Sequence, residues 1–293
     1  MNRRELLKYM AYLQGIFMSG CSLFNDRPCC DKGPTSSLTH GHAPLPLKNL
    51  IPNHNLNSEL AMKSRDFKTH FTDDILISSA QTQLLYSCVI KLRKLQKFVG
   101  YGNFNVLTWD RMIYFSRHYH QLEPFSRAEI QFLDDLFHSN AEKYGFMGEK
   151  VFTEISSQLK RKNIYKVPNS GHFLLKEISL KRYEQIIKDV GPALILTSGV
   201  RGVVKQFHLF LEKTLETKGN LSMASRSLAP PGYSFHGRGD FDVGKINFGI
   251  KNFTEDFAST NEYKLLSQLG YVGIRYPKGN ILGVRFEPWH VKV

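Results

Sequence analysis

The sequence contains little cysteine. Four of its 293 residues are cysteines, namely Cys21, Cys29, Cys30 and Cys88. Cys29 and Cys30 are adjacent, and none of the four has the paired spacing of a zinc finger. A chain of this length can bury a sizeable hydrophobic core without covalent links, so we expect no disulfide framework.

Acidic residues are scarce relative to basic ones. The chain has 26 Asp and Glu against 39 Lys and Arg, which gives a formal net charge of +13. This excess favours contact with polyanions. The sequence has no basic-aromatic motif or helix-turn-helix signature, so we expect no nucleic acid as a partner. The run Lys160–Lys162 is typical of a solvated helix face, and an anionic phospholipid or cell-wall polymer fits the charge equally well.

The N-terminal segment lacks the length of about 20 apolar residues that a membrane-spanning helix needs. Lys8 and Gln14 interrupt its moderately apolar stretch. Residues 2–8, with two consecutive arginines, resemble a twin-arginine export motif. Cys21 follows a stretch that resembles a lipoprotein cleavage box, with Met18 in place of the usual Leu. We therefore predict an export signal over residues 1–20 and lipidation of Cys21 as a membrane tether; the alternative is an amphipathic helix.

Residues 21–70 are rich in Pro, Gly, Ser, Asn and His and show no hydrophobic periodicity. Such a composition is typical of a linker. His40 and His42 lie in this segment, and we interpret them as solvated linker residues. The sequence predicts a tether here.

Residues 71–164 predict a helical region. Helical spacing of apolar residues marks a first helix, with Leu84, Leu85, Cys88, Val89, Leu92 and Leu95 on one face. A second helix begins after Ser126, a residue type that caps helix N-termini. Asp110, His118 and His120 match no metal-site pattern, so we assign them to a helical face. The region is either a positioning domain or a lid.

Residues 165–293 predict a mixture of strands and helices. A strand over 193–199 precedes a helix over 202–217. The runs 271–276 and 281–286 are strand-like, and a Pro-Lys-Gly-Asn turn between them indicates a hairpin. The sequence thus predicts the α+β class, with a small antiparallel sheet and flanking helices. His172 lies in an edge segment over 166–175 and is expected to face substrate or to be structural.

Two motifs in this region carry metal chemistry. SFHGRGDFDVG spans Ser234–Gly244, and EPWH spans Glu287–His290. Together they supply imidazoles and carboxylates for three zinc ligands and a general base, the set that a hydrolytic zinc site needs. Pro288 bends the chain and can aim Glu287 and His290 into one pocket. The alternative is an ordinary strand end with a buried Trp289 and a surface histidine.

The motifs resemble those of the VanY-like D-alanyl-D-alanine carboxypeptidases, zinc peptidases related to the Hedgehog domain. TSGVRGVVKQ over residues 197–206 resembles a third family segment, and the resemblance covers roughly residues 165–293. It implies a zinc peptidase domain with the metal in a groove across the sheet. It also implies roles for individual residues: zinc ligands His236, Asp242 and His290, general base Glu287, carbonyl-stabilising Arg201, and substrate-binding Ser234 and Gln206.

The sequence departs from the family pattern at the second ligand. The family usually places six residues between its first His and its Asp, whereas residues 237–241 separate His236 from Asp242. A one-residue slip reverses the side on which a strand residue lies, so Asp240 is the alternative ligand. Asp242 is preferred because it precedes Val243, as the family's ligand precedes an apolar residue.

A functional role for Arg201 can also be inferred without the family resemblance. It lies at the start of a predicted helix, where a positive charge opposes the helix dipole. This local cost favours a functional role over that of a solvated arginine.

The resemblance implies an exported protein of the periplasm or cell envelope that hydrolyses peptidoglycan stem peptides. D-alanyl-D-alanine carboxypeptidase is the leading interpretation, and peptidoglycan endopeptidase is the alternative within the enzymes. A zinc-stabilised cell-wall binding module without catalysis is the alternative outside them. The presence of Glu287 and Arg201 favours an enzyme, because a purely structural zinc site needs neither.

Overall fold

The structure is a computed structural model that describes residues 54–293. The predicted export signal, Cys21 and the first part of the predicted linker lie outside the described residues. Helix α2 (His54–Arg65) lies within the segment predicted as a linker, so regular structure starts before residue 70. No helix of the described part is long and apolar enough to cross a membrane.

The helical region contains α3 (Ser79–Val99), α4 (Tyr101–Phe104), α5 (Trp109–His118) and α6 (Arg127–His138). Both helices predicted here are present, as α3 and α6. Ser126 caps α6: its hydroxyl accepts the Glu129 amide at 3.2 Å, while the Glu129 side chain accepts the Ser126 amide. This reciprocal capping satisfies donors that would otherwise be left unpaired at the helix start.

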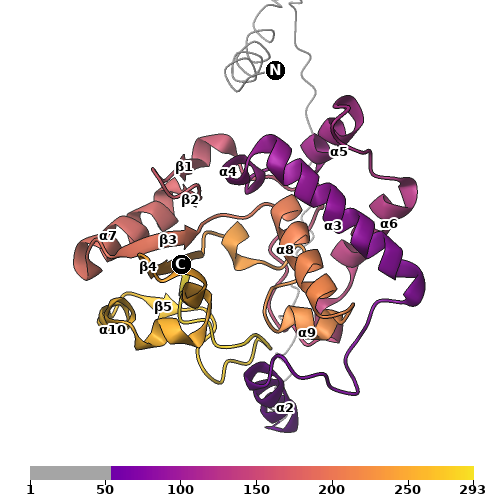
Figure 1. Ribbon diagram of the computed structural model, residues 1–293. Coiled ribbons are helices and arrows are strands. Elements are labelled where there is room, and N and C mark those ends of the chain that lie inside the picture. Colours follow the sequence, from indigo (N-terminus) through magenta and orange to yellow (C-terminus); the bar gives the residue numbers. More distant parts are fainter. Residues whose placement is uncertain (1–53) are drawn as a thin grey trace, which may run out of the picture. The chain divides into compact units, whose positions relative to one another are not determined.

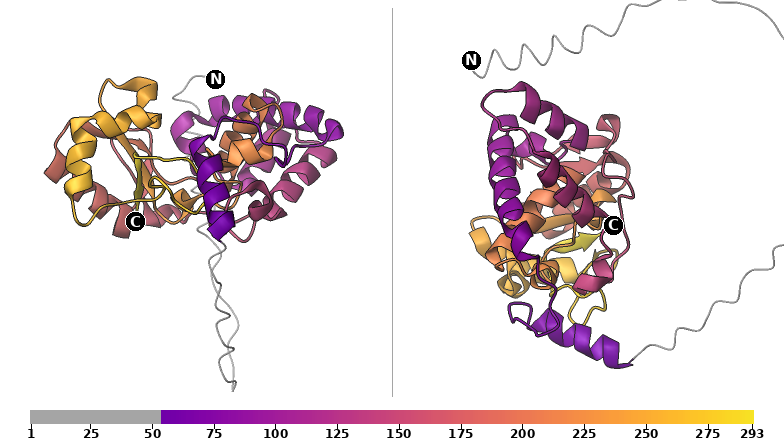
Figure 2. Two further views of the ribbon diagram at one scale, coloured as in Figure 1. Left: turned by 90° about the horizontal axis from the view of Figure 1, so that it is seen from below. Right: turned by 90° about the vertical axis from the view of Figure 1, so that its right-hand side faces the viewer.

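The main hydrophobic core contains residues of the helical region and of α8 (Val203–Glu216). Since α8 lies after residue 164, this core extends across the predicted domain boundary. Figure 2 shows the purple helices of the helical region gathered around the orange α8. The apolar faces of α3 and α8 meet in this core through Leu85, Val89, Leu92, Val204, Phe207 and Leu211. The packing of α8 therefore connects the helical region with the rest of the molecule.

A four-stranded antiparallel sheet lies in the C-terminal region (Figure 1). Its order is β3 (Leu194–Ser198), β4 (Phe241–Lys245), β6 (His290–Lys292) and β5 (Gly273–Ile274). Helices α7 (Lys181–Val190) and α10 (Asn261–Gln268) flank it, and the second core contains buried sheet residues such as Phe241, Val243 and Val291. The α+β class and the strand at 193–199 are confirmed.

The remaining elements are short. A two-stranded antiparallel sheet pairs β1 (Ile164–Lys166) with β2 (Phe173–Leu175). The short helices are α9 (Leu221–Ser225), η1 (Ala141–Tyr144), η2 (Arg161–Asn163), η3 (Lys176–Leu180), η4 (Phe235–Gly237), η5 (Gly249–Phe253) and η6 (Glu255–Ser259).

The predicted hairpin of residues 271–276 and 281–286 is wrong. The turn between them forms, since the Asn280 amide donates to the Pro277 carbonyl at 3.1 Å. However, β5 pairs with β6, and 281–286 forms no strand. Gly283 has a positive φ of 77° and lies so close to the Gly145 carbonyl that a Cβ would be 1.8 Å from it. Contact with residues distant in sequence thus overrides the local strand pattern.

Candidate metal centre

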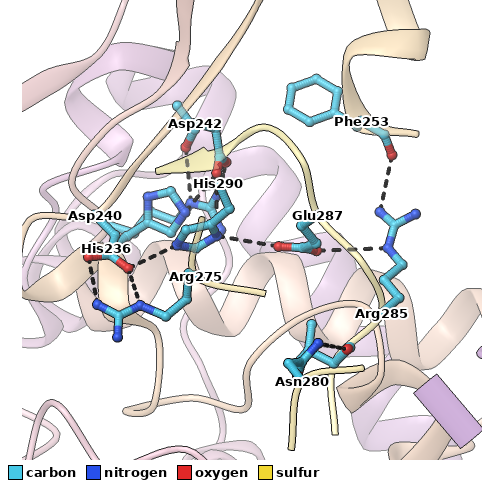
Figure 3. Close-up of polar contacts among 12 residues, drawn as sticks. His236, Asp240, Asp242, Phe253, Arg275, Asn280, Arg285, Glu287 and His290 are labelled. Carbon is cyan, nitrogen blue, oxygen red and sulfur yellow. Dashed lines mark hydrogen bonds and ion pairs between the residues drawn. The ribbon is translucent and has the colours of Figure 1, made fainter. Parts of the chain in front are cut away.

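Pairing of β4 with β6 creates the centre. Asp242 on β4 lies opposite His290 on β6 in the antiparallel register. Cross-strand neighbours lie on the same face of a sheet, so both side chains point to one side. His236 comes from η4, which residues 238–240 connect to β4. Figure 3 shows the three side chains pointing toward one another.

The three side chains are close and almost completely buried. Their ligand atoms all lie within 4.8 Å of one another. His236 Nε2 lies 3.4 Å from Asp242 Oδ2, and His290 Nδ1 lies 3.5 Å from Asp242 Oδ1. The exposed fractions are 1% for His236, 2% for Asp242 and 3% for His290. The residues predicted as ligands therefore come together as a set that could hold a metal ion.

Two atoms of the set are buried without a partner. The Nδ1 of His236 is 2.8 Å from the Gly199 carbonyl, which can only accept, so Nδ1 carries the proton and donates. This leaves Nε2 as an acceptor, and neither it nor Asp242 Oδ1 has a hydrogen-bond partner. A buried unsatisfied polar atom costs about 1–3 kcal/mol. A bound cation would satisfy both atoms, so the residues fit a metal.

Asp240, the alternative ligand, lies on the other side of the His290 ring. Its Oδ2 is 3.1 Å from His290 Nε2, and the Arg275 guanidinium donates to both of its carboxylate oxygens. Burial opposes ionisation of Asp240, but the hydrogen bonds from His290 and Arg275 lower its pKa to about 2. Asp242, and not Asp240, thus belongs to the group of three side chains that could hold a metal ion.

The charges around the ligands follow from these contacts. Burial alone would lower the pKa of His290, but hydrogen bonds to Asp240 and Glu287 raise it to about 9. Burial, together with the positive charge of Arg201, lowers the pKa of His236 to about 4. Burial opposes the charge of Asp242, yet the neighbouring His236 and Arg201 hold the pKa of this carboxyl well below its usual range.

Glu287 and Arg201 lie beside the three ligand side chains. Glu287 Oε2 is 3.3 Å from His290 Nδ1, and its Oε1 is 3.8 Å from Arg285 Nε. Arg201 donates to Asp242 Oδ2 at 2.7 Å and, through Nε, to the Ser198 hydroxyl at 3.1 Å. A carboxylate and a guanidinium therefore reach the candidate metal position from two sides.

A cavity of about 420 Å³ opens onto the centre. The cavity is lined by the three candidate ligand residues and also by Glu287, Arg201 and Ser234. His172 lines it as well, which agrees with the expectation of a substrate-side or structural residue. Gln206 does not line it. Gln206 is 2% exposed, and its side-chain amide donates to the Ala229 carbonyl, so it supports the loop that carries Ala229.

Sequence reasoning missed three residues around the centre. Lys205, in the first turn of α8, lines the cavity together with Arg201. The Tyr276 ring lies 5.0 Å from the His290 ring, edge to face. Arg275 binds Asp240 across a separation of 35 positions. The contacts of Arg275 and Tyr276 join residues distant in sequence, so no local pattern predicts them.

The fold and site define an α+β protein with a buried centre of two histidines and one aspartate. The model of the VanY family, described as D-alanyl-D-alanine carboxypeptidase, matches residues 175–293. The resemblance inferred from the motifs is therefore confirmed over this region. A comparison with curated proteins found no match.

Solved structures that are similar to part of this chain were also found. A structure of the LdcB LD-carboxypeptidase, described as revealing the basis of peptidoglycan recognition, is 26% identical with a TM-score of 0.36. The match covers 50% of this chain and 65% of that one. The vancomycin-resistance D,D-pentapeptidase VanY with Zn(II) is 28% identical, with a TM-score of 0.33, over 44% of this chain and 76% of that one. The structure of VanYB in complex with D-alanine-D-alanine is 28% identical, with a TM-score of 0.34. This match covers 44% of this chain and 75% of that one.

Proposed function

We propose that this protein is a zinc-dependent peptidase that removes the terminal D-alanine from peptidoglycan stem peptides. One observation carries the proposal. A buried trio of two histidines and one aspartate, with Glu287 and Arg201 beside it, opens onto a cavity. These residues lie in the region that matches the D-alanyl-D-alanine carboxypeptidase family model.

His236 Nε2, His290 Nδ1 and a carboxylate oxygen of Asp242 would hold the zinc ion. Nitrogen and oxygen donors of this kind suit zinc, and three protein ligands leave a coordination position open. Bound zinc supplies a Lewis acid and lowers the pKa of a water to about 7.

Glu287 is the proposed general base. It is 7% exposed, and its Oε2 lies 3.3 Å from a ligand nitrogen, at the edge of the metal position. A carboxylate here can accept the proton of the attacking water and later give it to the leaving amine. Arg285 Nε lies 3.8 Å from the other carboxylate oxygen and adds a positive charge beside Glu287.

Arg201 is the proposed electrostatic group. Its guanidinium is largely buried, and its ion pair with Asp242 fixes it beside the metal position. A fixed positive charge in such a site stabilises negative charge as it develops on the carbonyl oxygen of the substrate. The binding-module alternative leaves the buried positions of both Glu287 and Arg201 unexplained.

Lys205 favours a carboxypeptidase over an endopeptidase. It lies in the first turn of α8 and lines the same cavity as Arg201, and the described residues offer it no ion pair. Burial and the charge of Arg201 lower its pKa to about 8. A substrate that ends in a free carboxylate would pair with this cation, whereas an internal peptide bond has no such group.

Lys205→Met should raise KM about tenfold or more for a peptide with a free C-terminal carboxylate, because a hydrogen bond to a charged group contributes about 1.5–3 kcal/mol. The amidated peptide should show no such change, and Lys205→Arg should stay near wild type. The lysine loses its charge as pH rises through about 8, so wild-type KM for the free acid should rise there, but that of Lys205→Arg should not. Equal KM changes for acid and amide would instead favour the endopeptidase.

The location follows from a separate prediction. We propose that the protein is exported and tethered to the membrane through Cys21, on the basis of the twin-arginine and cleavage-box patterns. Cys21→Ser should release the mature protein from the membrane fraction, and replacing Arg3 and Arg4 with Lys should block export. Fractionation followed by immunoblotting measures both, and an unchanged distribution in both variants would contradict the proposal.

A further inference from the structure

We propose that Asp240 and Arg275 form a positioning pair that fixes the tautomer and orientation of His290, so that Nδ1 is available to the metal. This inference rests on the proposed zinc site. The pair lies outside the cavity, on the far side of the His290 ring from Asp242. Its role is therefore to act through His290 and not on the substrate.

The local sequence puts both carboxylates near one imidazole. Asp240 and Asp242 flank Phe241, at the start of β4. Alternate residues of an extended chain lie on one side, and the intervening Phe241 packs into the second hydrophobic core. His290 lies between the two carboxylates, with Nε2 3.1 Å from Asp240 and Nδ1 3.5 Å from Asp242.

The His290 ring has a carboxylate near each of its two nitrogens, so its orientation depends on which contact holds it. Glu287 Oε2 lies 3.3 Å from Nδ1, the nitrogen that faces the metal position. Asp240 accepts a hydrogen bond from Nε2, so this contact orients the ring with Nε2–H toward Asp240 and Nδ1 toward the metal position.

Every oxygen of Asp240 is held in place. Oδ2 accepts from His290 Nε2 and from Arg275 Nε at 2.6 Å. Oδ1 accepts from Arg275 Nη2 at 3.0 Å and from the Val293 amide at 3.0 Å. Asp240 is 1% exposed, so the two-point contact with Arg275 also compensates the buried charge.

Arg275 connects the pair to the other histidine segment. Its guanidinium lies 4.1 Å from the centre of the Phe235 ring, and Phe235 directly precedes His236. One arginine thus contacts the carboxylate behind His290 and the residue next to His236. We therefore expect it to hold the two ligand-bearing segments in register.

The first test measures zinc affinity by chelator competition in wild type, Asp240→Ala, Asp240→Asn and Arg275→Gln. Partners that orient metal ligands typically contribute 10- to 100-fold in metal affinity, so Asp240→Ala should weaken zinc binding by about that factor. Asp240→Asn keeps an oxygen acceptor for Nε2 and should lose less. Asp242→Ala removes a ligand and should weaken binding more than Asp240→Ala does.

Asp74→Asn is the matched control. Asp74 is also a buried aspartate paired with an arginine, Arg226, but it does not line the metal-site cavity. Its loss should lower the free energy of unfolding without changing zinc affinity in the folded protein. Circular dichroism checks that each variant is folded before zinc binding is measured.

The second test observes the histidines directly, by proton NMR of the cobalt-substituted protein. Each coordinated histidine has one exchangeable ring N–H. That of His236 donates to the Gly199 carbonyl, and that of His290 donates to the Asp240 carboxylate. In Asp240→Ala the His290 signal should exchange faster with water, while the His236 signal stays unchanged as an internal reference.

The outcomes separate this inference from the proposed function. Zinc held equally by wild type and Asp240→Ala, with the His290 signal unchanged, would overturn the positioning role alone. A folded wild-type protein that binds no zinc would overturn the proposed function and this inference together.

Discussion

Glu287→Gln should lower peptide hydrolysis by at least about a hundredfold while the protein keeps its metal. General base catalysis typically contributes a hundred- to ten-thousandfold, and the amide cannot accept the proton of the attacking water. The amide has the size of the carboxylate and can still hydrogen-bond, so the fold and the affinity for substrate should change little. Turnover of a stem pentapeptide, with zinc content measured on the same sample, gives the result.

Glu212→Gln provides the control for this variant. Glu212 lines the same cavity, but it forms an ion pair with Arg93 and does not contact the three ligand residues. Its replacement removes the same charge from the same cavity and should leave turnover within a few-fold of wild type. If both variants hydrolyse the peptide as fast as wild type, Glu287 is not the general base.

His236→Ala and His290→Ala should each lose the bound zinc, from an expected content of about one ion per chain. Each substitution leaves two protein ligands, and His236→Ala also removes the ring whose buried Nε2 has no other partner. Peptide hydrolysis should be lost together with the metal. Mass spectrometry of the intact protein under native conditions measures the metal content of each variant.

His172→Ala is the matched control for the metal ligands. His172 lines the cavity and contacts Asn105 through Nδ1 at 3.3 Å, but it is not one of the three grouped ligand residues. This variant should retain its zinc. Full zinc content in His236→Ala or His290→Ala would remove that residue from the ligand set.

Local patterns allowed much of the fold to be predicted. Helical spacing and the Ser126 cap predicted α3 and α6, because each residue of a helix interacts mainly with residues three and four positions away in the sequence. The short runs around residues 271–286 were less informative. Contacts of Gly283 with Gly145, and of Met147 with Leu282, decide the path of this segment, and no local pattern encodes them.

The candidate site divides in the same way. Two short motifs contain the histidines, Asp242 and Glu287, so their residue types and resemblance were enough to group them. The sequence left open whether Asp240 or Asp242 faces the metal. That choice depends on the β4–β6 register and on Arg275, both of which are long-range features. The burial of Gln206 likewise depends on its contact with the Ala229 carbonyl.

The most direct test of the central claim is digestion of purified peptidoglycan stem pentapeptide by zinc-loaded protein, followed by mass analysis. Parallel samples contain a chelator, zinc added back after chelation, or Glu287→Gln. We predict release of a single D-alanine by the wild type, loss of this product with the chelator and in Glu287→Gln, and recovery when zinc is restored. Zinc-replete wild-type protein that leaves the pentapeptide intact, or that releases D-alanine equally well with the chelator, would contradict the account.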